Sequence, residues 1–378
     1  MNLVYMRMLN PHNHLVWSTR YAILFVSIGY AMLTVFLSSC SADLTVHREK
    51  RLAKLSSFDT KYSIIFLIHG DNNYLYHDSS GNSYRANEEA LAAARRVAEE
   101  NSQAEVFIFH QKPASNFLFF FPIKDGEYFY YRNGMLIEND SYWRNQEQAN
   151  IDFEIDLYDQ LRLINHSNLI RMFVYLGHEI PEIDGVGYDL SYPDRTFTVD
   201  NIAHGLKNFT SDSAKFDLLI LSTCYGGTPY TIGKLGAFTN TIIASPENLH
   251  LSYFDLSALE RLDMTLMDGD VPAFAIKVAQ QSFDKLTSDL QTEVSVAVYD
   301  IKSVQKYLNS VNNEYNNKLI RLKDKTQSSL AAMERCDCAD VPAYQRSTIS
   351  EGVEVFYRAA RFGRLKNKES HSGWECWK

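Results

Sequence analysis

Five apolar runs separated by segments of helical spacing constrain this fold more than any other feature of the sequence. The runs are rich in Ile, Leu, Val and Phe, and they comprise Tyr62–His69, Ala104–His110, Ile170–Leu176, Phe216–Ser222 and Thr241–Ala244. Continuous apolar runs of this length are typical of strands that are buried on both faces of a sheet. The segments of helical spacing are Arg85–Asn101, Ile151–Ile164, Val199–Asn208 and Val271–Leu286. The alternation predicts a mostly parallel sheet with helices on both faces, a three-layer α/β sandwich.

Three further segments complete the expected domain. Between Asn116 and Glu138, turn residues interrupt aromatic runs and predict an antiparallel hairpin. Glu293–Tyr299 alternates in polarity and is expected at an edge of the sheet, whereas Ile301–Met333 has helical spacing. We therefore assign one domain to residues 61–300 and a C-terminal helical extension to residues 301–378.

The first forty residues have the features of an export signal. Arg20 precedes the uncharged apolar run Tyr21–Leu37, which ends in Leu37-Ser38-Ser39-Cys40. This ending resembles the lipobox of bacterial lipoproteins. It implies a signal peptide over 1–39, a lipidated tether over 40–60 with lipid on Cys40, and an exported protein anchored to the membrane of a bacterial cell envelope. A plain transmembrane anchor is the alternative reading of the same apolar run.

The charge balance and the cysteine content limit the partners and the disulfides that this chain can have. The chain has 37 Lys and Arg against 46 Asp and Glu, and this acidic balance argues against a nucleic-acid partner. Cys336 and Cys338 are too close to pair with each other, so either could form a disulfide with Cys376 outside the cytoplasm.

A histidine and a cysteine follow neighbouring strands of the predicted sheet. His178 comes after Ile170–Leu176 and Cys224 after Phe216–Ser222, and ligands of such sheets bind at the carboxyl ends of the strands. A cysteine nucleophile needs a base within hydrogen-bond reach, and the 46-residue separation suits one strand–helix–strand crossover. The pattern predicts nucleophilic catalysis by Cys224 with His178 as general acid and base; an unrelated buried cysteine is the alternative.

The order of these motifs resembles the clostripain-like family of caspase-like cysteine peptidases. The resemblance extends from about Tyr62 to Tyr307. It rests on five short blocks: Asp71-Asn72-Asn73, Val174–His178, Leu219–Cys224, Ile243–Glu247 and Ser295–Asp300. It implies a caspase-like sandwich that cleaves peptides or proteins, possesses an oxyanion site at the backbone of Glu179 and Cys224, and prefers Arg or Lys before the scissile bond. Glu247 and Asp255 are the candidate acidic residues of that pocket. The sequence requires no cofactor or metal, although the resemblance allows a calcium ion.

Two positions depart from the family pattern. Glu179 stands where caspase-like peptidases carry Gly after the histidine, and Ser222 stands where clostripain-like enzymes carry an acidic residue two positions before the cysteine. A catalytically inactive surface lipoprotein that acts as a binding module is therefore the alternative function.

Two weaker sites compete with this assignment. His204-Gly205 supplies a literal His-Gly pair in a predicted helix, and a metal could be bound by His69, Asp71, His77 and Asp78. The chain lacks a Gly-x-Ser-x-Gly motif, which disfavours a serine esterase.

Overall fold

The structure is a computed structural model that describes residues 60–378, apart from a few short segments. These are 71–74, 78–82, 119, 145–148, 163–168, 187, 211–213, 250–252, 267–268, 324 and 326–333. The expected signal peptide, Cys40 and nearly all of the tether lie outside the described residues, as do Asp71-Asn72-Asn73 and Asp78.

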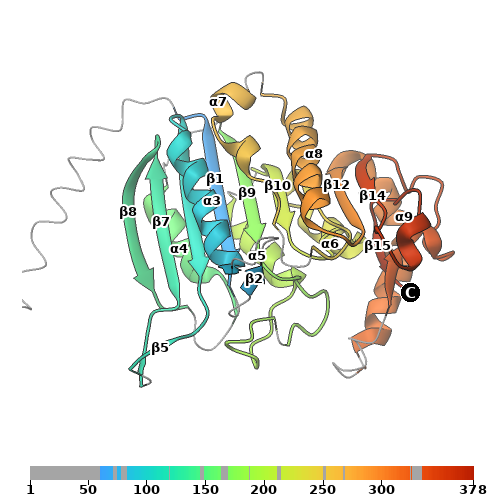
Figure 1. The fold of residues 1–378 in the computed structure, drawn as a ribbon, viewed down its shortest axis with the longest axis horizontal. Helices are drawn as coiled ribbons and strands as arrows, with labels where there is room; N and C mark the ends of the chain where they lie inside the picture. The colour runs from blue at the N-terminus through green and yellow to red at the C-terminus, as the bar shows by residue number, and fades with distance from the viewer. Residues whose placement is uncertain are drawn as a thin grey trace, which may run out of the picture. The chain divides into compact units, whose positions relative to one another are not determined.

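A nine-stranded sheet in the order β14-β12-β11-β10-β9-β1-β4-β7-β8 forms the centre of the domain (Figure 1). Its five parallel strands are β1 (Tyr62–His69), β4 (Ala104–Gln111), β9 (Ile170–Leu176), β10 (Phe216–Ser222) and β11 (Thr239–Ala244). Every side chain of β1 and β4 is buried, because helices cover both faces. The predicted parallel sheet is confirmed.

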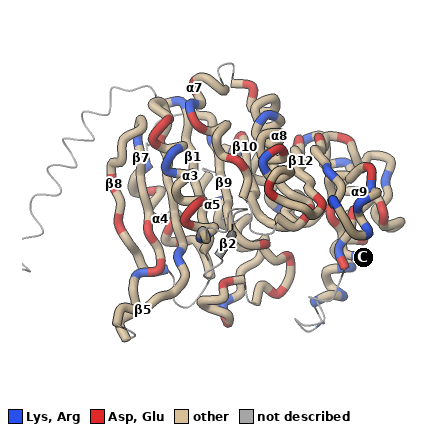
Figure 2. Tube along the Cα trace, viewed as in Figure 1, with Lys and Arg blue, Asp and Glu red and all other residues tan. Residues whose placement is uncertain are grey.

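Two groups of helices enclose the sheet (Figure 1). One face packs against α3 (Ala86–Glu100), α7 (Leu262–Thr265) and α8 (Val271–Asp289). The other packs against α4 (Asp152–Leu161), α5 (Val199–Phe209), α6 (Pro229–Leu235) and α9 (Ile301–Lys323). Each helix buries an apolar stripe; in α3 it comprises Ala90, Ala94, Val97 and Ala98. Acidic and basic residues are interspersed along the outer surfaces (Figure 2).

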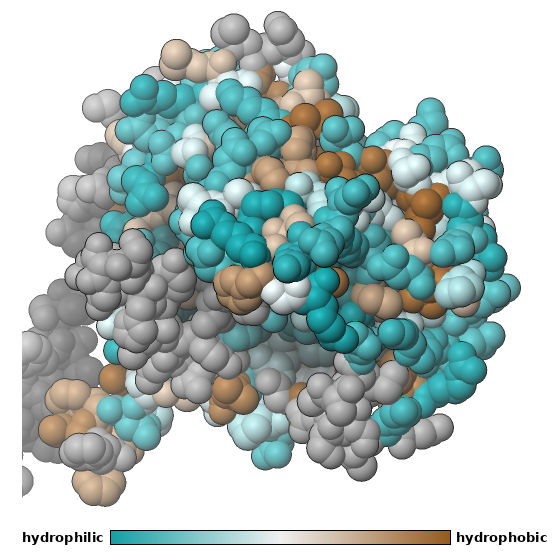
Figure 3. Space-filling model, turned by 45° about the vertical axis from the view of Figure 1, so that its right-hand side comes forward, coloured by the Kyte–Doolittle hydropathy of each residue, from teal (hydrophilic) through white to brown (hydrophobic). Residues whose placement is uncertain are grey.

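Antiparallel strands extend the sheet at one side. β7 (Gly126–Arg132) pairs with β4 and with β8 (Met135–Tyr142), which confirms the predicted hairpin. Two shorter two-stranded pieces precede it. They are β2 (Leu75–His77) paired with β3 (Ser83–Arg85), and the ribbon of β5 (Asn116–Phe117) and β6 (Phe121–Pro122). Phe117, Phe120 and Phe121 in that ribbon are exposed, whereas the face in Figure 3 is mostly hydrophilic with scattered hydrophobic side chains.

The C-terminal region differs from the helical extension expected. After α9 come β13 (Arg335–Asp337), η2 (Cys338–Asp340), β14 (Val353–Arg358), η3 (Arg364–Asn367) and β15 (Glu375–Trp377). β14 pairs antiparallel with β12 (Val294–Asp300), so the strand expected at the edge lies one position inside it. Short strands of this kind carry too weak a periodicity to be distinguished from loops in the sequence.

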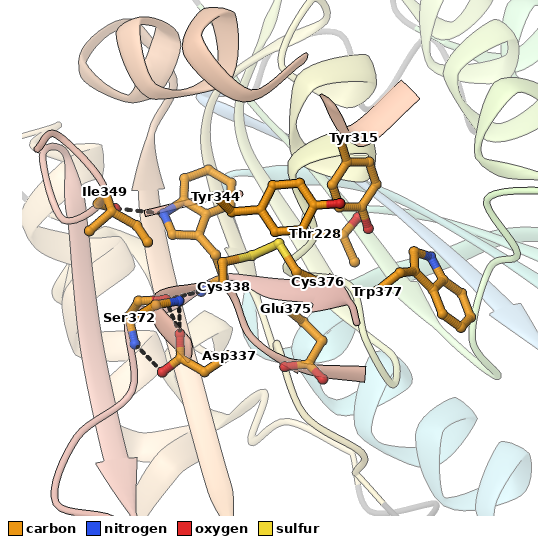
Figure 4. Close-up of a disulfide and its surroundings, with 12 residues drawn as sticks. Thr228, Tyr315, Asp337, Cys338, Tyr344, Ile349, Ser372, Glu375, Cys376 and Trp377 are labelled. Carbon is orange, nitrogen blue, oxygen red and sulfur yellow. Dashed lines mark hydrogen bonds between the residues drawn. A yellow bond between two sulfur atoms is a disulfide. The ribbon is translucent and has the colours of Figure 1, made fainter. Parts of the chain in front are cut away.

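A disulfide closes the end of the chain. Cys338 pairs with Cys376 across a separation of 38 residues, which resolves the two pairings that the sequence left open, and Cys336 is free. β13 and β15 pair antiparallel beside this bond, with Arg335 opposite Trp377. We call these two strands the C-terminal ribbon. Tyr344, Glu375 and Trp377 surround the disulfide (Figure 4).

Candidate active site

The register of β9 and β10 places His178 and Cys224 at equivalent positions. Leu176 pairs with Ser222, and the Gly177 amide lies 3.4 Å from the Ser222 carbonyl oxygen. His178 and Cys224 each come two residues after this pair. Because adjacent strands lie about 5 Å apart, the two residues emerge side by side at the carboxyl edge of the sheet, where the sequence predicted a site.

The loop after β11 holds the Cys224 thiol. Sγ donates to Oδ1 of Asn248 at 3.2 Å and accepts the amide of Leu249 at 3.3 Å. The side chain is half-buried. An amide donated to sulfur stabilises the thiolate, which is the reactive form.

The turn after Cys224 has a specific backbone shape. Tyr225 has a φ of 52°, and its amide donates to the Glu247 carbonyl at 3.2 Å. A Cβ on Gly227 would collide with the Tyr299 hydroxyl and would lie 3.0 Å from Pro246. α6 then begins after Thr228, whose hydroxyl accepts the Thr231 amide at 3.1 Å and caps the helix. The tight turn therefore fixes Cys224 relative to the loop after β11.

His178 is held through its own backbone. Its carbonyl accepts hydrogen bonds from the hydroxyls of Thr223 and of Tyr175, the latter at 3.1 Å. Thr223 directly precedes Cys224, so this bond joins the two loops. The side chain is half-buried, and desolvation lowers the pKa of the imidazole below its usual value. A neutral imidazole at neutral pH can accept a proton from a thiol.

Glu179, the first departure from the family pattern, forms an ion pair with Arg335 of the C-terminal ribbon. Burial raises the pKa of Glu179, and the guanidinium opposes that shift. Arg335 is 11% exposed at its side chain, and its guanidinium lies 4.5 Å from the centre of the Tyr225 ring. The carboxylate beside the expected oxyanion site therefore has a fixed positive partner.

Ser222, the second departure, has a structural role. Its side chain is fully buried, and its hydroxyl accepts the Phe254 amide at 2.8 Å. That bond anchors the loop after β11, which carries Asn248, to the end of β10.

Glu247 faces a buried histidine. Its carboxylate Oε1 lies 3.2 Å from Nε2 of His371, which also lies 3.6 Å from Oε2 of Glu375. Among the described residues these three bring possible metal ligands within 4.8 Å of one another. The Gly373 amide donates to Nδ1 of His371 at 3.0 Å, so the ring proton lies on Nε2, which faces the carboxylates. Calcium prefers six to eight oxygen ligands, whereas this cluster offers two carboxylates and one imidazole.

Asp255 lies farther along the same loop. Its carboxylate accepts the Ser257 amide at 2.8 Å. It lines a cavity of about 280 Å³ between α3 and α8, whose wall also includes Leu176 at the end of β9 and Phe254. The structure thus brings Glu179, Glu247 and Cys224 around one turn and places Asp255 on an adjoining wall.

Of the two competing sites, one lies away from the strand ends and the other lies beside the candidate site, where a Cβ on Gly177 would come within 2.9 Å of the His69 Cβ. His204 is exposed on α5, where Nε2 contacts the Asn208 amide group at 3.0 Å, and not at a strand end. His69 is buried at the end of β1 with Nδ1 bonded to Gln111 at 2.9 Å, and burial lowers its pKa to about 4.

Two residues of the site, Asn248 and Arg335, were not predicted from the sequence. Asn248 directly follows the Ile243–Glu247 block, so the position of that loop could have indicated it. Arg335 is 156 residues from Glu179, and no local pattern signals such a pairing.

In the part of the chain that the structure describes, none of the helices has the length and apolarity needed to cross a bilayer.

Comparison with known proteins gives matches of fold. No protein-family profile and no curated protein matches the chain. The structure is similar to that of an inactive zymogen C11 protease from Parabacteroides distasonis, with a TM-score of 0.54 and 12% identity over 85% of this chain and 92% of that one. It is also similar to iotapain, a secreted C11 cysteine protease from Bacteroides thetaiotaomicron, with a TM-score of 0.53 and 12% identity over 84% of this chain and 93% of that one. The predicted caspase-like fold, as found in the C11 (clostripain-like) cysteine proteases, is confirmed.

Proposed function

We propose that this chain is a cysteine peptidase in which Cys224 is the nucleophile and His178 the general acid and base. The observation that carries the proposal is the placement of both residues two positions beyond a paired strand position, at the carboxyl edge of a fold that C11 proteases share. Asn248 and Leu249 contact the sulfur, and half-burial favours a neutral His178.

The proposed reaction has two stages. His178 takes the thiol proton as Sγ attacks the carbonyl carbon of the scissile bond, and the backbone amides of Glu179 and Cys224 stabilise the oxyanion. The C–N bond breaks as the imidazolium returns the proton to the leaving amine. A water molecule, deprotonated by His178, then attacks the thioester and releases the acid and the free thiol.

Hydrolysis of a fluorogenic peptide by the exported part of the chain tests the proposal. We expect Cys224→Ala to abolish turnover without loss of fold, because the change removes little volume. Cys336→Ala, at a cysteine that the described residues leave outside the disulfide, is the matched control and should retain activity. Undiminished hydrolysis by Cys224→Ala would contradict the assignment. A wild type that binds peptides without cleaving them would support the binding lipoprotein instead.

We further propose cleavage after Arg or Lys. An acidic pocket would hold such a side chain by a charge-assisted hydrogen bond, which is bidentate for Arg. Of the two candidates, Glu247 is already 3.2 Å from His371, whereas Asp255 lines a cavity. We therefore expect Asp255 to contribute more. A panel of peptides that differ only before the cut should show a basic preference that weakens more in Asp255→Asn than in Glu247→Gln. A preference for apolar or acidic residues would contradict the pocket.

We also propose that Cys40 carries a lipid that anchors the exported protein. The support is the Leu37-Ser38-Ser39-Cys40 sequence after an apolar run. Detergent partitioning should move Cys40→Ala from the detergent to the aqueous phase. Equal retention of both forms would favour a transmembrane anchor.

A further inference from the structure

The C-terminal ribbon reaches the loops on both sides of the candidate site. From β15, the Glu375 amide donates to the Gly227 carbonyl at 3.0 Å, three residues after Cys224. The Trp377 indole donates to Oε2 of Glu182 at 2.7 Å, four residues after His178. From β13, Arg335 pairs with Glu179. The ribbon therefore contacts the loop that follows β9 and the loop that follows β10.

Arg335 lies where these contacts converge. Its guanidinium lies between two aromatic rings, 4.0 Å from the centre of the Trp377 ring and 4.5 Å from that of Tyr225. Aromatic faces of this kind hold a guanidinium by cation–π attraction and restrict its orientation. Because Tyr225 follows Cys224 and Glu179 follows His178, one side chain joins both halves of the site.

The charge on Arg335 matters because of where Glu179 lies. The reaction develops negative charge on the thiolate and then on the oxyanion, and an unpaired carboxylate one residue from His178 would repel both. Because Glu179 is half-buried, solvent would only partly screen its carboxylate after the loss of this partner. Any residue other than proline retains an amide at position 179, so the carboxylate is the obstacle that this departure from the family pattern introduces.

We propose that Arg335 is a positioning residue of the peptidase: it neutralises Glu179 and holds the His178 and Cys224 loops in their reactive arrangement. The inference rests on the proposed function. It assigns to the C-terminal ribbon an electrostatic role that compensates for the missing glycine.

The test is a double-variant cycle between Arg335 and Glu179. We expect Arg335→Met, which keeps an unbranched apolar stem and removes the charged guanidinium, to lower kcat by about 10- to 100-fold with little change in KM. Glu179→Gln in the Arg335→Met background should recover most of that loss, because no carboxylate then remains to be neutralised. Equal losses in the single and double variants would overturn the proposal and leave only a packing role for Arg335.

A second readout does not depend on peptide hydrolysis. The rate at which iodoacetamide alkylates Cys224 follows the thiolate fraction. The pH midpoint of this alkylation rate should rise in Arg335→Met and fall back to the wild-type value in the double variant with Glu179→Gln. It should stay near the wild-type value in Arg335→Lys, which retains the charge. Arg335→Lys also serves as the test variant if Arg335→Met fails to fold. An unchanged midpoint in Arg335→Met, or a raised one in Arg335→Lys, would overturn the proposal. Wild-type Cys224 that reacts no faster than in the unfolded chain would instead contradict the peptidase itself.

Discussion

The centre of the sheet and the C-terminal ribbon both position the candidate site, but they do so by different means. β9 and β10 are buried between two helical layers, and their pairing places His178 beside Cys224. The ribbon consists of two three-residue strands held by a disulfide, and it contacts the same loops through charge and aromatic stacking. The comparison indicates that hydrophobic burial determines where His178 and Cys224 lie, whereas the ribbon places a positive charge against Glu179.

The largest expected effect is a loss of peptidase activity on removal of His178, which the pairing of β9 and β10 positions. His178→Ala should lower kcat/KM for a peptide substrate by about 10²- to 10⁴-fold, the range for a lost general acid–base residue. His204→Ala on the exposed face of α5 is the matched control and should change the rate little. If His204→Ala proves the more damaging change, the base has been misassigned.

Truncation of a side chain in the core of the sheet should lower the stability of the whole protein. Leu219 in β10 is fully buried, and Leu219→Ala should lower the free energy of unfolding by about 2–5 kcal/mol. Leu118→Ala, at a side chain that is 62% exposed, should change it by less than about 0.5 kcal/mol. Denaturant unfolding measures both. Similar values for the two variants would contradict the assignment of β10 to the core.

Loss of the disulfide should act mainly on the ribbon. Cys376→Ala opens a loop of 38 residues and should lower the free energy of unfolding by about 2–4 kcal/mol. We expect hydrogen exchange at β13 and β15 to increase more than exchange at β10, together with a partial loss of activity. Cys336→Ala, which breaks no disulfide, is the control. Uniform exchange changes across the sheet would show that the ribbon is not a separate unit.

The sequence predicted those parts of the fold in which burial repeats regularly. The apolar strands and the positions of His178 and Cys224 at their ends could be inferred, because a strand buried on both faces has a distinctive composition. The strands β13 and β15 could not be inferred, since strands of three residues have no measurable period. The Glu179–Arg335 ion pair could not be predicted from the sequence, because it joins two segments far apart in the chain that only the folded sheet brings together.

Labelling of the wild-type protein with a peptide that carries a thiol-reactive group tests the central claim most directly. We predict that such a probe, with Arg or Lys before the reactive group, modifies Cys224 selectively, and that mass spectrometry of the digested protein finds the adduct there and not at Cys336. Modification should fall sharply in His178→Ala. Equal labelling of Cys224 and Cys336, or labelling that does not depend on folding, would contradict a cysteine peptidase site at the ends of β9 and β10.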